Sequence, residues 1–218
     1  FSDMSREVKS LVRKKMIMGV LATDMTFHFS IKADLDSLTA RKKEAFRSKT
    51  PFTLTEKDRD LVLKAALHAS DISNPCKPWE TCKAWSDRVI TEFFDQGDRE
   101  KREGLPVSMS CDRDTTHQDE LSMNFSDFIV APFFFSLINF LPKMFPVGET
   151  LISNRQSWYD MYLARMEKDT LSDEPDSEAS EKRKISMANF AKRAQGFATS
   201  SSAAIADAKE QLALAAAE

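Results

Sequence analysis

The sequence has few of the residues that tight turns, disulfide scaffolds and metal centres require. Only 5 of its 218 residues are glycine, which argues against a turn-rich sandwich or barrel and favours helices. The three cysteines, Cys76, Cys82 and Cys111, form no Cys-x-x-Cys pair. Neither a disulfide framework nor a zinc ribbon is therefore expected, and a reducing, cytoplasmic setting is predicted. The chain also has only 3 histidines and no His-Asp pair.

A strong charge of one sign and a long membrane span are missing as well. The formal net charge is −3, so nothing electrostatic suggests nucleic acid as a partner. The N-terminal residues do not resemble a signal peptide. One apolar run, residues 128–141, is shorter than the roughly twenty residues that a spanning helix needs. We therefore expect it to be a buried core helix and predict no transmembrane segment.

Helical patterns recur along the chain to about residue 168. The spacing of Thr53 and Glu56 suits a capping box at a helix start, Pro75 should end that helix, and Gly97 suits the end of the next one. The predicted fold is all-α. The helices are expected over residues 4–28, 53–74, 78–97, 119–141 and 149–166, with a polar connection at 40–51.

The composition changes after the predicted domain, which covers residues 1–168. Residues 169–181 are acidic and rich in serine and are interpreted as a linker. Residues 182–218 are alanine-rich and poor in large apolar side chains, so we expect a helical or disordered tail that buries little area and whose partner the sequence does not identify. Within it, the run from Arg183 to Ser186 resembles a site for a basophilic kinase, although the match could be accidental.

Six short segments occur in an order and at a spacing that together resemble one enzyme family, the class I 3′,5′-cyclic nucleotide phosphodiesterases. The resemblance covers roughly residues 7–166. The segments are VLATDM at 20–25 followed by His28, HASDISNP at 68–75, WSDR at 85–88 with EFFDQGD at 92–98, CDR at 111–113, FSDFIV at 125–130, and NRQSWY at 154–159.

The resemblance implies a multi-helix catalytic domain of the HD-superfamily type, of which this chain is the carboxy-terminal part, truncated on its N-terminal side. It implies hydrolysis of cyclic AMP or cyclic GMP to the 5′-monophosphate with two divalent metal ions, zinc and magnesium or manganese. The histidine that acts as general acid, and three of the four metal ligands, are expected upstream of Phe1. No catalytic residue is therefore assigned here, and a homodimer is left open.

Asp71 is the position onto which one family metal ligand maps. It falls at the C-terminal end of a predicted helix, where the helix dipole disfavours an anion unless a cation lies nearby. His68, three residues earlier, should share its face and is assigned to the pocket or to the residues behind it. The alternative for Asp71 is an ordinary solvated carboxylate.

The resemblance also implies a set of substrate-binding residues. Asn74 would contact the purine ring, although it could equally serve only to stop a helix. Phe125 would stack on the purine, although it could equally pack in a core. Met25 is also assigned to substrate binding, and Thr23, Asp24 and Glu92 to the pocket or the residues behind it. Asp24 could equally be a salt-bridge partner, and Met25 a core residue.

Ser122 is the main departure from the family, because it stands where the family carries its purine-selecting glutamine. Asn124 also replaces a common glycine. These departures leave two hypotheses open: a phosphodiesterase of which this chain is a part, and a degenerate, non-catalytic regulatory or binding module.

Overall fold

The computed structural model describes residues 2–170 and 178–216, and within these ranges the chain is helical with no β-strand. The all-α prediction is thus confirmed. The elements are α1 (Arg6–Leu21), η1 (Met25–Phe27), α2 (His28–Arg47), α3 (Glu56–Asp71), η2 (Asn74–Cys76), α4 (Trp79–Arg102), α5 (Gln118–Phe125), η3 (Ser126–Val130), α6 (Ala131–Phe140), η4 (Pro142–Met144), α7 (Phe145–Thr170) and α8 (Glu178–Ala216).

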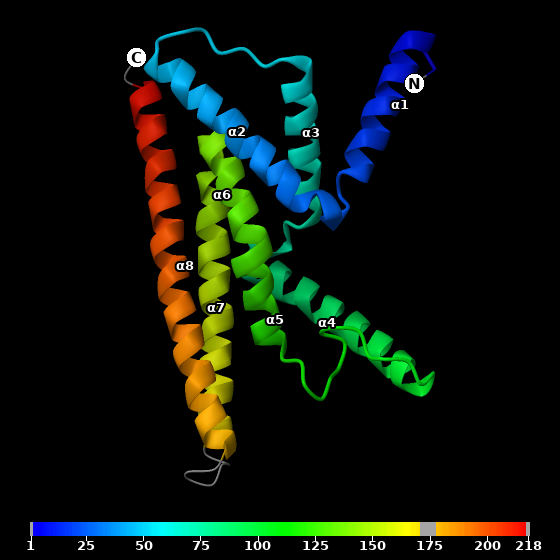
Figure 1. The fold of residues 1–218 in the computed structure, drawn as a ribbon, viewed down its shortest axis with the longest axis vertical. Coiled ribbons are helices and arrows are strands. Elements are labelled where there is room, and N and C mark those ends of the chain that lie inside the picture. Colours follow the sequence, from blue (N-terminus) through cyan, green and yellow to red (C-terminus); the bar gives the residue numbers. More distant parts are fainter. Residues whose placement is uncertain (1, 171–177, 217–218) are drawn as a thin grey trace.

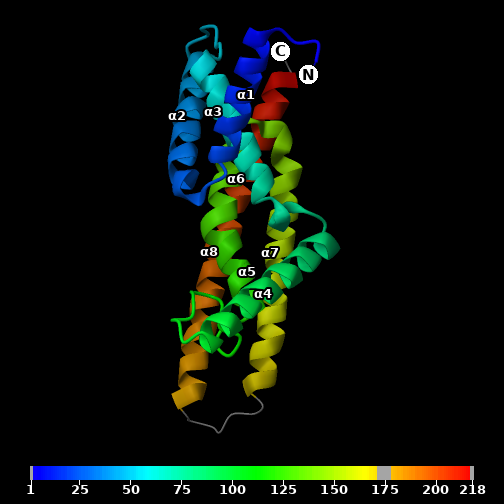
Figure 2. The same ribbon diagram turned by 90° about the vertical axis from the view of Figure 1, so that its right-hand side faces the viewer.

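The helices form an elongated bundle built around one long central rod (Figure 1). α5, η3 and α6 make this rod, with α7 and α8 alongside it and α2 and α3 across its upper half. α7 and α8 lie side by side over much of their length (Figure 2). α1 and α4 project away from the rod, and α4 carries one wall of the pocket described below.

The central rod confirms the expected apolar helix. Its five-residue middle turn, η3, is π-helical, and the N–H of Ala131 donates to the carbonyl of Ser126 at its end. By length and composition the helix Gln118–Phe140 could cross a membrane, but half of its most apolar window is buried inside the structure. Core packing accounts for that apolar character, since Phe133 and Phe134 are almost fully buried.

The N-terminal region differs from the expected helix over 4–28 and connection at 40–51. α1 ends at Leu21, and the Asp24 carboxylate accepts a bond from the Thr26 N–H at 2.8 Å and starts a 3-10 turn. α2 then continues to Arg47. Residues 40–47, which the sequence predicts as part of a connection, are the last two turns of this helix. They are mainly polar, and the buried leucines of the helix, Leu35 and Leu38, lie before them.

Two helix boundaries also differ. The capping box is Thr55 with Asp58, not Thr53 with Glu56. α4 continues past Gly97 to Arg102, and the glycine beyond its end is Gly104, at φ +70°. A Cβ atom on Gly97 would lie 2.0 Å from the Cys111 carbonyl oxygen, so this glycine permits close approach of a loop instead of ending the helix.

α8 differs most from expectation. It covers the outer side of α6 and α7, and Ile205 and Ala208 join Ile138 in a small apolar cluster. Phe190 joins a second cluster with Met123, Trp158, Tyr162 and Met166. The expectation that the tail buries little area is wrong, because small side chains let α8 approach closely. Most of the expected linker, residues 171–177, lies outside the described residues.

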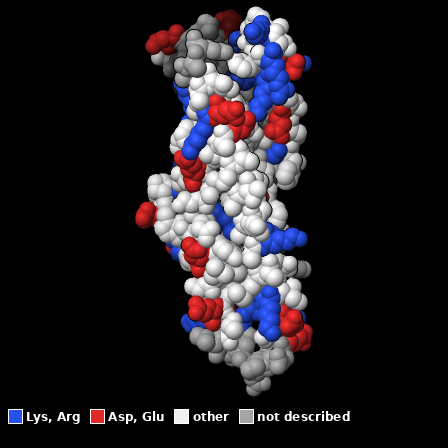
Figure 3. Space-filling model, turned by 90° about the vertical axis from the view of Figure 1, so that its left-hand side faces the viewer, with Lys and Arg blue, Asp and Glu red and all other residues white. Residues whose placement is uncertain are grey.

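The face that α8 presents to solvent carries charges of both signs. Lysine, arginine, aspartate and glutamate side chains are interspersed on it, with uncharged surface between them (Figure 3). This face therefore offers no extended patch of one sign.

Candidate functional site

A pocket of about 400 Å³ opens between the C-terminal end of α3, one face of α4 and the start of the central rod. Its lining is mainly apolar, with a few polar groups, as in many small-molecule sites. The residues around it are Asp71, Ile72, Asn74, Pro75, Cys82, Trp85, Ser86, Val89, Ile90, Phe93, Leu121, Ser122, Phe125 and Trp158.

Asn74 is the polar group of this pocket that lacks an internal partner. Its Oδ1 atom is buried and accepts no hydrogen bond from any residue that the structure describes. A buried acceptor without a donor is costly unless a ligand satisfies it. Asn74 is held by its neighbours, since Asn154 donates from Nδ2 to the carbonyls of Pro75 at 2.8 Å and Lys77 at 2.7 Å.

Ser122 and Phe125 reach the pocket from α5, one turn apart. The Ser122 hydroxyl lies 3.0 Å from the hydroxyl of Ser86 on α4. Gln118, one turn earlier, donates to Ser86 at 3.1 Å and to the Asp87 carboxylate at 2.7 Å. The amide of Gln118 is thus engaged with α4, so it does not replace the glutamine that the family carries at position 122.

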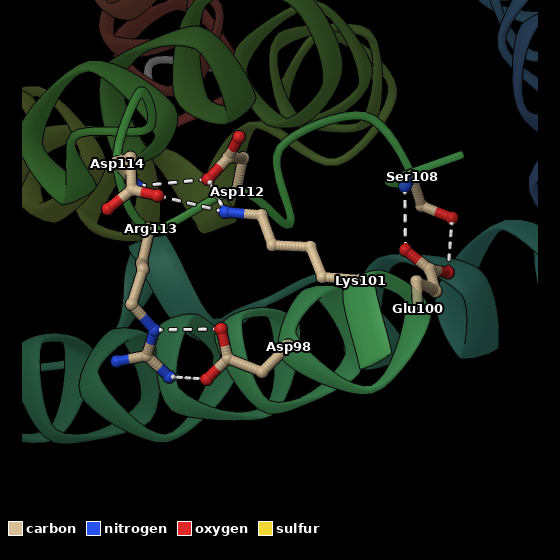
Figure 4. Close-up of polar contacts among 7 residues, drawn as sticks. All are labelled: Asp98, Glu100, Lys101, Ser108, Asp112, Arg113 and Asp114. Carbon is tan, nitrogen blue, oxygen red and sulfur yellow. Dashed lines mark hydrogen bonds and ion pairs between the residues drawn. The ribbon is translucent and has the colours of Figure 1, made fainter. Parts of the chain in front are cut away.

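The loop that leads into α5 is fixed to α4 by charged pairs (Figure 4). Arg113 makes a bidentate contact with Asp98, at 3.1 and 2.5 Å. Lys101 donates to Asp112 at 2.6 Å and Asp114 at 2.9 Å, and the Glu100 carboxylate accepts two bonds from Ser108. The exposed pairs each contribute little alone, but together they set where α5 begins, and therefore where Ser122 lies.

A buried ion pair fixes the other side of the rod. Arg155 of α7 donates from Nε and Nη2 to both carboxylate oxygens of Asp127, each at 3.0 Å, and their side chains are 2% and 8% exposed. Removing one partner of such a pair commonly costs about 3–5 kcal/mol. Two of the segments picked out in the sequence, FSDFIV and NRQSWY, therefore meet in space.

Asp71 lies at the edge of the pocket and is exposed. No group of three or more His, Cys, Asp or Glu side chains that could hold a metal ion occurs in the described ranges. A single carboxylate does not provide the three or four protein ligands that zinc prefers. The residues present therefore do not, by themselves, fit a two-metal centre.

His28 and His68 are not available to such a centre, because they contact each other. Nδ1 of His28 lies 2.8 Å from Nε2 of His68, and both side chains are fully buried beside Phe133. Burial lowers the pKa of both imidazoles, and the neighbouring His68 lowers the pKa of His28 further. Asp71 partly opposes the lowering of the pKa of His68. The pair therefore favours the neutral state.

Four residues expected near the pocket do not line it. Thr23, Asp24 and Met25 lie at the junction of α1 and α2, where the Thr23 hydroxyl donates to the Val20 carbonyl at 2.8 Å and Met25 is 44% exposed. Glu92 is exposed on α4 and borders a separate surface hollow.

Several lining residues were not expected from the sequence. Trp85 and Ser86 belong to a segment that the sequence picked out, so their position there was the available signal. No signal in the sequence pointed to Cys82 or Leu121, because whether they line the pocket depends on how α4 and α5 are oriented.

Comparison with known proteins gives consistent results. The family described as 3′5′-cyclic nucleotide phosphodiesterase matches residues 1–151. The chain is 36% identical over 161 residues to a Rattus norvegicus protein named 3′,5′-cyclic-AMP phosphodiesterase 4C, covering 73% of this chain and 30% of that protein. A Caenorhabditis elegans protein named probable 3′,5′-cyclic-AMP phosphodiesterase pde-4 is 35% identical over 159 residues, covering 72% of this chain and 23% of that protein.

Solved structures resemble the fold. LmjPDEB1 in complex with IBMX superposes with a TM-score of 0.67 and 29% identity, over 75% of this chain and 47% of that chain. The phosphodiesterase domain of the RhoPDE fusion protein from the choanoflagellate Salpingoeca rosetta has the same TM-score at 24% identity, over 76% and 51% of the two chains, and supports the fold alone. The chain spans less than a third of the length of these curated relatives.

Proposed function

The chain belongs to the 3′5′-cyclic nucleotide phosphodiesterase family, and we propose that it forms the substrate-binding part of an enzyme that hydrolyses the 3′ phosphoester of cyclic AMP or cyclic GMP. The observation that carries the proposal is the pocket in which the unpartnered Asn74 carbonyl, Phe125 and Asp71 come together. An apolar slot with one buried acceptor suits a flat, nitrogen-rich ring better than a flexible or purely apolar ligand.

Each residue has a distinct role in this proposal. Phe125 stacks on the base, a contact worth about 1–3 kcal/mol for aromatic rings and bases. Asn74 accepts a hydrogen bond from a ring or exocyclic N–H through the oxygen that the protein leaves unpaired. Ser122 reaches the same ring only through its short hydroxyl. The ring is therefore held by stacking and by one amide, with little to distinguish adenine from guanine.

The family's chemistry depends on metal ions, and we propose two of them, zinc and magnesium or manganese, in the complete protein. Such ions polarise the phosphate and supply a hydroxide nucleophile. Asp71, at the pocket's edge, would supply one ligand, and the others would come from outside the 218 residues.

The acid that protonates the departing 3′ oxygen is also proposed to lie outside these residues. His28 and His68 are paired and buried. His117, the third histidine, is exposed before α5 and does not border the pocket.

A second function is favoured by Ser122 specifically. A pocket that has lost its orienting glutamine could bind a cyclic nucleotide without rapid turnover, as a regulatory module. The two functions share the binding site and differ in hydrolysis, so a single set of variants can distinguish them. For either function we propose a reducing, cytoplasmic setting, supported by the free state of Cys76, Cys82 and Cys111.

The test is made in the complete protein with Phe125→Ala, and with Phe29→Ala as control, because Phe29 is exposed and does not line the pocket. We expect Phe125→Ala to raise KM for both cyclic nucleotides roughly tenfold to a hundredfold, with Phe29→Ala unchanged. Binding without measurable hydrolysis by the wild type would select the regulatory module. Equal behaviour of the two variants would exclude the pocket as the nucleotide site.

A further inference from the structure

The helix α8 is joined to the pocket-bearing rod by hydrogen bonds and ring contacts of Arg193. Arg193 of α8 donates from Nη2 to the Asn124 side chain at 2.8 Å and to the Asp127 carboxylate at 2.9 Å. Its guanidinium also lies 4.8 Å from the ring centre of Phe128 and 4.7 Å from that of Phe190. Arginine over two aromatic faces, with a partly buried carboxylate, is a favourable docking contact.

Asn124 ties this contact to the pocket-bearing helix. Its side-chain oxygen accepts the bond from Arg193, and it lies on α5 between Ser122 and Phe125. Asn124 and Asp127 contact α8, whereas Ser122 and Phe125 line the pocket, so α5 and its continuation are held from both sides. Asn124, Asp127 and Arg193 therefore link α8 to the helix that carries the pocket residues.

Ser186 lies nearer the start of α8 than Arg193 and contacts α7 through Tyr162. Its hydroxyl is 3.1 Å from the hydroxyl of Tyr162, whose side chain is fully buried. The Tyr162 ring packs against Phe190 at 4.5 Å between ring centres. The space around the Ser186 hydroxyl is therefore already filled by a buried neighbour.

Three of the four side chains just before Ser186 are exposed. The side chains of Lys182 and Lys184 are 74% and 63% exposed, and Ile185 is 56% exposed. Arg183 stands three residues before Ser186. Basic side chains at this spacing, with the acceptor hydroxyl half-buried, suit a basophilic protein kinase that modifies Ser186 when α8 opens locally.

We propose that a basophilic protein kinase phosphorylates Ser186 and that the phosphate releases the first half of α8 from α5 and α7. The Ser186 Oγ attacks the γ-phosphorus of ATP. A new P–Oγ bond forms, the bond from the γ-phosphorus to the bridging oxygen breaks, ADP leaves, and a base of the kinase takes the hydroxyl proton. The inference concerns α8 and does not depend on hydrolysis of a cyclic nucleotide.

Release follows from space and charge. A phosphoryl group adds about −1.5 to −2 charges at neutral pH, and on the Ser186 oxygen it would displace the 3.1 Å contact with the buried Tyr162 hydroxyl. The pKa of Tyr162 is raised mainly by burial, with a smaller contribution from Glu120 that Arg165 opposes. The nearby Arg165 is already engaged with Asp119 at 2.8 Å and with Glu120 at 2.6 Å. The phosphate therefore breaks the contact with Tyr162 beside an arginine whose donors already bind two carboxylates.

The test uses the complete protein, the catalytic subunit of a cyclic-AMP-dependent protein kinase as the probe, and magnesium ATP. Mass spectrometry should find one phosphate on Ser186 in the wild type and none at that position in Ser186→Ala. Hydrogen exchange of the α8 amides between Ser186 and Phe197 should then become about tenfold faster or more, with exchange in α2 and α3 unchanged.

Matched variants separate docking from a general effect of charge. Ser186→Asp should accelerate exchange in α8, whereas Ser202→Asp should not, because Ser202 is exposed on the same helix. Arg193→Ala should act like Ser186→Asp, with the exposed Lys192→Ala as its control. If Ser186→Asp fails to fold by circular dichroism, the phosphorylated wild type provides the measurement. Failure to label Ser186, or labelling with unchanged protection of α8, overturns the proposal.

Discussion

Replacing Gly97 with alanine should destabilise the protein, against the usual preference of helices. In an open helix interior, alanine is favoured over glycine by about 1 kcal/mol. At Gly97, however, the new Cβ would lie 2.0 Å from the Cys111 carbonyl oxygen and 2.7 Å from its carbon. Both atoms belong to the backbone of a loop fixed to α4 by ion pairs, so the loop must move.

The magnitude follows from these two opposing effects. Overpacking in a filled site costs about 1–3 kcal/mol, and a clash with backbone belongs at the upper end. The net loss is therefore about 2 kcal/mol, which for a domain of this size lowers Tm by about 4–8 °C. The Cys111 loop leads directly into α5, so the displacement should also reach Ser122.

Gly196 provides the matched control. It lies in the interior of α8, and a Cβ added there would meet no atom within 4 Å. Gly196→Ala should raise Tm by about 2–4 °C, since only the helix preference acts. Differential scanning calorimetry on both variants measures the two shifts. If Gly97→Ala also raises Tm, the close approach of the loop is not part of the folded state, and the reasoning is refuted.

Three further predictions concern the site. In the complete protein, Ser122→Gln should raise kcat/KM about tenfold to a hundredfold and sharpen the preference for one nucleotide; kinetics that are already tight and selective in the wild type would contradict this. Asp71→Ala should remove most activity and reduce bound metal, measured by elemental analysis, and full activity would end the ligand assignment. In the folded state the pKa values of His28 and His68 lie below the ordinary value of 6.5. The two histidines therefore contribute fully to stability above about pH 6.5, and this contribution is lost as the pH falls through their folded-state pKa values. A Tm that stays constant from pH 7 to 4 would contradict this prediction.

The α6 part of the central helix could be predicted because its residues are apolar nearly all round, and a helix buried on most sides needs no periodic pattern. α2 was only partly recognised, since its first buried side chain is a polar one, His28, paired with a histidine forty residues away. Burial of α8 could not be predicted from residue size. Ala208 and Ser201 are fully buried because small side chains allow close packing, and a sequence of small residues does not reveal which helix they approach.

Some of the residues predicted for the site border the pocket and others do not. Asn74, Ser122, Phe125 and Asp71 border one pocket, and the segments that contain them were recognised as belonging to one family. Met25 belongs to another such segment but lies away from the pocket at the junction of α1 and α2. A segment shared with a family indicates that its residues contribute to the fold or to the site. It does not indicate to which of the two a given residue contributes.

The π-helical turn at Ser126–Val130 lies between the part of the central helix that borders the pocket, α5, and the part that packs in the core, α6. An extra residue within a helix rotates every later side chain by about 100° about the axis, so the angular phase of α6 is set independently of that of α5. Positions that face the pocket can therefore vary over evolutionary time without changing which side of α6 enters the core. Ser122 lies before the turn and borders the pocket, whereas Phe133 and Leu137 lie after it and are buried in the core.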